Sequence, residues 1–354
     1  MLKRFIAMLA VSALLLAGIT TYYTRTGTRA DGLYYAASGI RPDAQILSVN
    51  GETVSAEEYL YWLDSVCEYL DSYVGGGLDF NAQVTEDMTF SQFAKSDAVT
   101  TTLLYAVVRQ MAQEQGITLT AEDQAALDAQ RAQYVTYYGG EEAYALQLQI
   151  LGVPEALQRQ VEEVPFLYNR LFLAYSDPNG QLYPGAEALQ TFGEQNGYVT
   201  AQLLYFPTGE LDEAAAADMK TAAANYAAQL SAAADKQAVY AAMADALGLA
   251  VDAAGYTFCP TDSDPLVCAA VSNLAPGEVS DVIEGASGFY VALGMETNYA
   301  SLAEVLFNIH LQELQDSAKV EYSKMYDALD AGIFYENLLE ARIALMEQML
   351  GQSR

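Results

Sequence analysis

The sequence predicts a mainly helical α+β protein, in which one mixed unit interrupts a larger set of helices. Hydrophobic residues make up 52% of the 354-residue chain, which is enough to form a core and excludes a disordered chain. Apolar residues recur at helical spacing over most of residues 45–180 and again from about residue 300. Between these stretches, alternating apolar segments indicate short strands around helices.

The charge and the histidine content exclude several classes of function. Lys and Arg number 16 against 46 Asp and Glu, which gives a net charge of −30. Because Lys and Arg make the contacts with phosphate backbones, we expect no nucleic-acid partner. His310 is the single histidine, so a site with two or three histidine ligands cannot be built, and we expect no metal or other cofactor.

The cysteines do not indicate a disulfide framework, because they are odd in number and unequally spaced. They are Cys67, Cys259 and Cys268. At most one pair could form a bond, and Cys259 with Cys268 is the nearest candidate in the sequence. The sequence leaves open whether these two are joined.

The first residues have the pattern of an export signal. Lys3 and Arg4 precede the apolar run 5–19, which is short for a membrane-spanning helix of about 20 residues. We interpret residues 1–30 as a signal peptide or, if it is not cleaved, as a membrane anchor. Ile19 stands where a lipoprotein signal has its acylated cysteine, so lipid attachment there is excluded. The remaining chain is expected outside the cytoplasm, either secreted or anchored to the outer face of the cytoplasmic membrane.

Order is expected to begin after a linker at residues 31–44, which show no period. Residues 46–49 predict a short strand, and Asn50-Gly51 favours a tight turn. Ser55-Ala56-Glu57-Glu58 is typical of a capping box that opens a helix. The apolar face of this helix consists of Tyr59, Trp62, Leu63, Val66 and Leu70.

Four further helices are predicted before residue 180, each bounded by glycine or a capping pattern. They span 99–115, 120–138, 141–151 and 154–175. The capping pattern of the second begins at Thr120, and Asp177-Pro178-Asn179-Gly180 predicts a turn after the last.

The pattern changes from residue 198. Strands are predicted at 199–206, 255–258 and 287–293, and helices at 211–234, 236–246 and 265–274. Leu302, Val305, Leu306 and Ile309 then mark the start of a helical stretch over 301–350. The predicted domains are a signal or anchor at 1–30, a linker at 31–44, an N-terminal helical module at 45–180, the mixed domain at 196–298, and C-terminal helices at 299–354 that pack on the N-terminal module.

The segment 46–63, ILSVNGETVSAEEYLYWL, resembles the opening of the SurA/PrsA family of extracytoplasmic foldases and chaperones. The stretches 116–123 and 151–154 agree with that family in order and spacing. The resemblance implies a helical chaperone module, of the SurA and trigger-factor kind, that is built from both ends of the chain and carries an inserted parvulin-like domain.

The middle of the chain is similar to a parvulin-type (PpiC) peptidyl-prolyl isomerase domain. Residues 201–204, Ala-Gln-Leu-Leu, stand where the family has Ala-Arg/Ser-His-Ile-Leu, and 268–280 follow its Ala-x-x-x-Leu-x-x-Gly-Glu-Val-Ser pattern. Residues 288–293 fit the closing Gly-Tyr-His-Ile-Ile strand. The resemblance places Gln202 and Tyr290 at the two catalytic histidine positions, so we expect the rotamase activity to be absent.

The resemblance implies a peptide-binding chaperone or foldase that holds unfolded or folding exported polypeptides by apolar contacts and needs no cofactor. The substrate-binding candidates are Tyr59, Trp62, Met243, Phe258 and Phe289. Two alternatives stay open: an active prolyl isomerase that works through Gln202 and Tyr290, and a non-catalytic cell-surface protein for assembly or adhesion. The sequence leaves open the clients, the oligomeric state, and a contact with the membrane through an uncleaved N-terminal segment.

Overall fold

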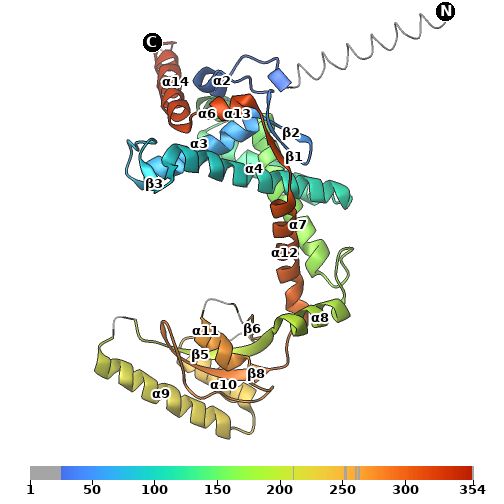
Figure 1. The fold of residues 1–354 in the computed structure, drawn as a ribbon, viewed down its shortest axis with the longest axis vertical. Coiled ribbons are helices and arrows are strands. Elements are labelled where there is room, and N and C mark those ends of the chain that lie inside the picture. The colour runs from blue at the N-terminus through green and yellow to red at the C-terminus, as the bar shows by residue number, and fades with distance from the viewer. Residues whose placement is uncertain (1–24, 210, 251–252, 260, 262–263, 353–354) are drawn as a thin grey trace, which may run out of the picture. The chain divides into compact units, whose positions relative to one another are not determined.

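The computed structural model describes residues 25–209, 211–250, 253–259, 261 and 264–352 (Figure 1). It divides into two compact units, which we call the helical unit, Met1–Leu171 with His310–Arg354, and the α+β unit, Phe172–Ile309. The predicted class, α+β and mainly helical, is confirmed. Residues 1–24 of the predicted export signal lie outside the described residues. In the part of the chain that is described, no helix combines the length and the apolar character needed to cross a bilayer.

The helical unit contains segments from both ends of the chain. Its elements are α2 (Leu33–Ser38), β1 (Gln45–Val49), β2 (Glu52–Ser55), α3 (Ala56–Tyr73), β3 (Gln83–Thr85), β4 (Met88–Thr89), α4 (Phe90–Glu114), α5 (Ala121–Tyr138), α6 (Glu141–Leu151), β9 (Val320–Tyr322), α13 (Lys324–Ala328) and α14 (Ala331–Gln352). Two helices, α7 (Glu155–Ser176) and α12 (Leu302–Ser317), each begin in one unit and end in the other.

A three-stranded sheet joins the two ends of the chain. Its order is β2-β1-β9, and all pairs are antiparallel. Asn50 occupies the turn between β1 and β2 with φ 53°. The N–H of Asn50 donates to the Lys319 carbonyl at 2.9 Å, and the N–H of Lys319 donates to Asn50 Oδ1 at 2.9 Å. The turn that the sequence predicts is therefore also the point at which the C-terminal segment is attached.

Two predicted helix boundaries need correction. The helix predicted from residue 99 begins at Phe90, because Thr89 and Gln92 form a capping box that the sequence analysis overlooked. The predicted helical stretch 301–350 is also interrupted by a strand, since β9 lies between α12 and the helices α13 and α14. The predicted capping box at Ser55 is present only in part. Ser55 Oγ accepts from the Glu58 N–H at 3.2 Å, but the Glu58 carboxylate binds Arg109 instead.

Residues 31–44 were predicted as a linker without structure, and this prediction is wrong for α2. Tyr34 and Ala37 of this helix are buried, and Figure 1 draws α2 beside α14. Asn337 Nδ2 donates to the Ala37 carbonyl at 3.0 Å, and the Tyr34 ring packs on Phe334 with centroids 6.1 Å apart. A helix of six residues is too short to show a period, so only its contacts with α14 reveal it.

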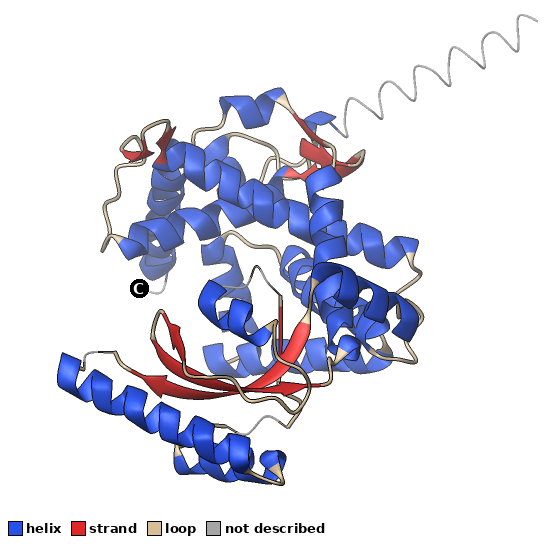
Figure 2. Ribbon diagram, turned by 60° about the horizontal axis from the view of Figure 1, so that its bottom comes forward, coloured by secondary structure: helices blue, strands red, loops and turns tan. Residues whose placement is uncertain are grey.

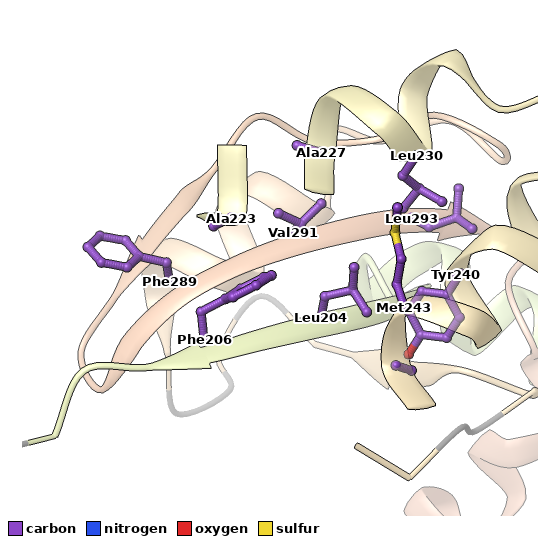
Figure 3. Close-up of a cluster of buried hydrophobic side chains, with 11 residues drawn as sticks. Leu204, Phe206, Ala223, Ala227, Leu230, Tyr240, Met243, Phe289, Val291 and Leu293 are labelled. Atoms are coloured by element: carbon purple, nitrogen blue, oxygen red, sulfur yellow. The ribbon is translucent and has the colours of Figure 1, made fainter. Parts of the chain in front are cut away.

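The α+β unit is built on one antiparallel sheet with the order β6-β5-β8-β7. Its elements are α8 (Ala186–Asn196), β5 (Val199–Pro207), α9 (Glu213–Ala232), α10 (Lys236–Ala246), β6 (Tyr256–Phe258), α11 (Pro265–Val271), β7 (Ile283–Gly285), β8 (Gly288–Met295) and the short 3₁₀ helix η1 (Tyr299–Ser301). Figure 2 shows helices on both faces of this sheet. Side chains of α9 and α10 pack on one face (Figure 3), and those of α11 pack on the other.

Candidate functional site

The two predicted catalytic residues lie on opposite faces of the sheet. In the pairing of β5 with β8, Gln202 is opposite Leu293 and Tyr205 is opposite Tyr290. Residues directly opposite each other share a face, and successive residues of a strand alternate between faces. Gln202, which is 1% exposed, therefore faces α9 and α10 together with Leu204, whereas Tyr290 faces α11. The prediction that Gln202 and Tyr290 occupy one site is wrong.

Leu203 is the β5 residue that matches the family's histidine on the face of Tyr290. In the Ala-Arg/Ser-His-Ile-Leu pattern the histidine stands two residues after the alanine, and Leu203 stands two residues after Ala201. Leu203 and Tyr290 both pack against the cluster that includes Val267 and Ile283. Since a leucine side chain has no polar atom, it cannot form a hydrogen-bonded pair with the residue at position 290. The predicted position at Gln202 is therefore one residue too early along the strand.

The polar groups around Tyr290 hold the end of the sheet. Its hydroxyl is 2.9 Å from Ser287 Oγ, and its ring stacks on Tyr205 with centroids 4.9 Å apart. The Tyr205 hydroxyl donates to the Ser287 carbonyl at 3.0 Å. The Asp264 carboxylate caps α11 and accepts from the Ala286 N–H at 3.1 Å. The Tyr290 and Tyr205 hydroxyls could donate hydrogen bonds to a peptide. Their observed contacts with Ser287 hold the β7–β8 hairpin in place.

The predicted substrate-binding residues differ in exposure. Tyr59 has no exposed surface, its hydroxyl donates to the Lys95 carbonyl at 3.2 Å, and burial raises its pKa. Met243 and Phe289 are 8% and 7% exposed and belong to the core under α9 and α10 (Figure 3). These three residues cannot contact a client without repacking of the core, so we withdraw them as candidates.

Trp62 and Phe258 keep part of their surface exposed. The Trp62 ring lies 4.8 Å from the Tyr61 ring and 4.5 Å from the Tyr105 ring, measured between centroids. Phe258 packs at the edge of the cluster beneath Tyr290. The role of Trp62 and Phe258 as substrate contacts remains a prediction.

A groove in the helical unit offers an apolar surface that the sequence analysis did not identify. It lies among α2, α6, the loop after α6, and α14, and we call it the α2–α6–α14 groove. Its volume is about 490 Å³, and its lining is Arg29, Asp31, Gly32, Leu33, Tyr34, Pro42, Glu57, Ala145, Leu148, Gln149, Gly152, Val153, Pro154, Glu155 and Leu345. Most of these side chains are apolar, as is usual for ligand-binding pockets.

Gly152 allows the two walls of the groove to approach. It ends α6 with φ 79°, a backbone conformation that glycine adopts without strain. A Cβ at this position would lie 3.2 Å from Leu33 Cβ and 3.4 Å from the Tyr34 ring. A side chain at residue 152 would therefore require α2 to move by a few tenths of an ångström.

Charged side chains also line the groove, namely Arg29, Asp31, Glu57 and Glu155, and we call them its mouth and the apolar lining residues its floor. Arg29 Nε donates to Asp31 at 3.2 Å, and Arg29 Nη1 donates to Glu57 at 3.2 Å. Burial raises the pKa of Glu57, although Arg29 partly opposes this. Glu155 forms an ion pair with Arg131 of α5. The groove therefore combines an apolar floor with a charged mouth.

The segment that carries Arg29 is held by Asp43. The Asp43 carboxylate accepts from the N–H groups of Thr28 and Arg29, at 2.8 Å and 2.9 Å. Partial burial acts to raise the pKa of Asp43, but these hydrogen bonds hold it below its usual value. This segment falls within the predicted signal and linker, at 1–30 and 31–44. The apolar run that starts at Leu33 was the one signal that could have revealed the groove.

The described residues contain no group of three or more His, Cys, Asp or Glu side chains arranged to hold a metal ion. The three cysteines are present as thiols rather than as disulfides. Cys259 Sγ lies 3.2 Å from Thr261 Oγ1, and Cys67 and Cys268 are buried.

The fold defines a helical protein whose chain leaves one unit, forms an α+β unit around a four-stranded sheet, and returns. No family model matches this chain, and no curated protein matches it by sequence. It is similar to the solved foldase PrsA of Streptococcus pneumoniae, with 17% identity over 84% of this chain and 94% of that one and a TM-score of 0.29. Foldase PrsA of Lactococcus lactis is 16% identical over 84% of this chain and 93% of that one, with a TM-score of 0.28. A SurA-like chaperone structure from Campylobacter jejuni is 12% identical over 79% of this chain and 99% of that one, with a TM-score of 0.25.

Proposed function

We propose that this protein is an extracytoplasmic chaperone that binds unfolded or folding polypeptides through its helical unit. The α2–α6–α14 groove is the observation that carries this proposal, because it presents apolar side chains in an accessible cavity of about 490 Å³. A polypeptide that has not folded exposes apolar side chains, which gain free energy when such a surface removes them from water. The net charge of −30 keeps a protein with this surface soluble.

The proposed location outside the cytoplasm has separate support. Lys3 and Arg4 followed by the apolar run 5–19 have the pattern of an export signal. Whether the segment is cleaved or serves as an anchor does not change the proposed activity.

Suppression of aggregation tests the proposal. A chemically unfolded protein is diluted into buffer with the full chain, and light scattering is followed. Leu345→Glu places a charge in the groove at a half-buried position, so we expect several-fold more of this variant to be needed for the same suppression. Ile343→Glu is the control, since Ile343 lies on the same helix, is 53% exposed and does not line the groove.

Equal suppression by both variants would contradict the role of the groove. Absence of suppression by the unaltered chain would contradict the chaperone function itself, and would favour the assembly or adhesion protein.

We also propose that the α+β unit does not catalyse prolyl isomerisation. The support for this is Leu203, which supplies no hydrogen-bonding group beside Tyr290. Exchange at an X-Pro bond takes tens to hundreds of seconds without a catalyst, so even weak acceleration can be measured in a short peptide. We expect the rate to equal that of the peptide alone, while an active parvulin accelerates it.

Acceleration by the full chain would contradict this part of the proposal. If Tyr290→Phe then abolished that acceleration and Gln202→Ala retained it, an active isomerase site would lie on the α11 face of the sheet.

A further inference from the structure

We infer that the α2–α6–α14 groove selects polypeptide segments in which a large apolar side chain lies next to Lys or Arg. This inference rests on the proposed function and names the class of client segment that the groove takes. The apolar floor and the charged mouth would bind neighbouring side chains of one extended segment.

The floor of the groove determines the apolar part of this preference. Leu33 of α2, Leu148 of α6 and Leu345 of α14 line it from three helices, and Val153 lines it from the loop after α6. The volume of about 490 Å³ lies within the roughly 300–1,000 Å³ of ligand pockets. An aliphatic or aromatic side chain that enters loses its contact with water against these four residues.

The mouth of the groove determines the basic part. Three carboxylates line the groove, those of Asp31, Glu57 and Glu155, against the single guanidinium of Arg29. Arg131, which binds Glu155, belongs to α5 and does not line the groove. Asp31 and Glu57 thus share one cation between two negative charges, and a Lys or Arg of the client would supply a second.

The exposure of these groups favours a basic client over an acidic one. The Asp31 side chain is 70% exposed and can bind a cation without losing much solvent, whereas Arg29 is already held by two carboxylates at 3.2 Å. An acidic client would have to displace one of them and would also be repelled by the net charge of −30. Only 16% of the Glu57 side chain is exposed, so an added cation would stabilise a carboxylate that has lost most of its hydration.

Three matched peptides test the inference by fluorescence anisotropy with the full chain. They share one apolar core and carry two Lys, two Glu or two Gln beside it. We expect the Lys peptide to bind up to about fivefold more tightly than the Gln peptide, the factor of one partly exposed ion pair. The Glu peptide should bind more weakly than both, and added salt should reduce the differences.

Two variants locate the charge effect. Glu57→Gln and Asp31→Asn should each reduce the ratio of the affinity for the Lys peptide to the affinity for the Gln peptide. Asp31 is exposed, so its variant is expected to fold even if Glu57→Gln does not. Glu340→Gln is the control, because it removes one negative charge from an exposed position of α14 that does not line the groove.

The outcomes separate this inference from the proposed function. Equal binding of the Lys and Glu peptides, tighter binding of the Glu peptide, or an equal effect of Glu340→Gln would overturn the inference. If Leu345→Glu still weakened all three peptides in those cases, the groove would remain the binding site without charge selection. If no peptide bound, the proposed function would fail as well.

Discussion

The helical unit and the α+β unit differ in how they hold distant parts of the chain together. In the helical unit, buried charged side chains connect segments from both ends of the sequence. Asp64 of α3 and Arg342 of α14 form an ion pair in which the side chains are 8% and 11% exposed. In the α+β unit, the ion pair of Lys220 with Glu284 is exposed, and apolar side chains join the sheet to its helices.

This difference follows from the path of the chain. The α+β unit is one continuous segment, so its strands and helices meet after short connections. The helical unit must join residues such as Asp64 and Arg342, which are 278 positions apart. Arg342 also donates to the carbonyls of Ile150 and Leu151, at 3.2 Å and 3.0 Å. One guanidinium of α14 thus binds both α3 and α6, and its directional contacts define how the C-terminal helix docks.

The largest expected effect is that of Arg342→Met on the helical unit. The variant leaves the Asp64 carboxylate buried without its cation, which costs about 3–5 kcal/mol of unfolding free energy. Denaturant unfolding followed by the fluorescence of Trp62, the single tryptophan, reports on this unit. Asp64→Asn on the same background should recover part of the loss, since it removes the unpaired charge. Lys220→Met is the control in the α+β unit and should cost at most about 1 kcal/mol.

The second effect in size is that of Leu204→Ala on the α+β unit. Leu204 has no exposed surface and packs between the sheet and the helices α9 and α10 (Figure 3). Its truncation leaves a cavity and should cost about 2–5 kcal/mol. Hydrogen exchange of the β5 and β8 amides should accelerate, while the Trp62 transition stays in place. A shift of the Trp62 transition would show that the two units do not unfold separately.

Two cap variants give a smaller effect that should be equal in the two units. Ser55 Oγ accepts from the Glu58 N–H at 3.2 Å, and Asp212 Oδ1 accepts from the Ala215 N–H at 2.8 Å. We expect Ser55→Ala and Asp212→Ala to cost about 1 kcal/mol each. Trp62 fluorescence measures the first and hydrogen exchange in α9 the second. A much larger loss for Ser55→Ala would indicate that the entry to α3 supports the whole helical unit.

The smallest effect is a pH dependence confined to the helical unit. Asp123 accepts from Arg170 Nε and Nη2, each at 2.8 Å, and these hydrogen bonds, with that of the Thr120 N–H, lower its pKa. A carboxyl whose pKa is lowered by folding stabilises the fold at pH values above its pKa in the unfolded chain, which is about 3.9. This contribution disappears as the pH falls towards the pKa of the carboxyl in the folded protein. Asp123→Asn should therefore be less stable than the unaltered chain at pH 6, and the difference should shrink between pH 5 and pH 2. A difference that stays constant over this range would show that the charge is not involved.

Local patterns predicted many of the elements, because they depend on neighbouring residues. The helix predicted at 141–151 coincides with α6, and the one at 236–246 coincides with α10. Both lie between clear boundaries, with glycine at the ends of α6 and an Asp cap before α10. Among the elements that were missed, α8 has eleven residues, but α2 and β9 have only six and three. Segments this short have no period of their own and are stabilised by what they pack against.

The candidate sites were predicted less well than the elements. Gln202 and Tyr290 were paired by alignment to a motif. The register of β5 with β8 decides which side chains share a face, and a shift of one residue moves a side chain to the opposite face of the sheet. Tyr59 was expected to bind substrate, yet aromatic residues at helical spacing also form cores, and burial decides between the two.

The sequence by itself determined the fold class, the acidic charge and most of the helices, because composition and periodicity are properties of the chain. Only the tertiary structure decided that Arg29, Leu148 and Leu345 line one groove and that Leu203 lies on the face of Tyr290. The groove is lined by residues that are hundreds of positions apart in the sequence, and a local sequence pattern cannot predict that such residues lie close together. Its existence depends on α14 docking against α2 and α6, which the buried contacts of Arg342 make specific.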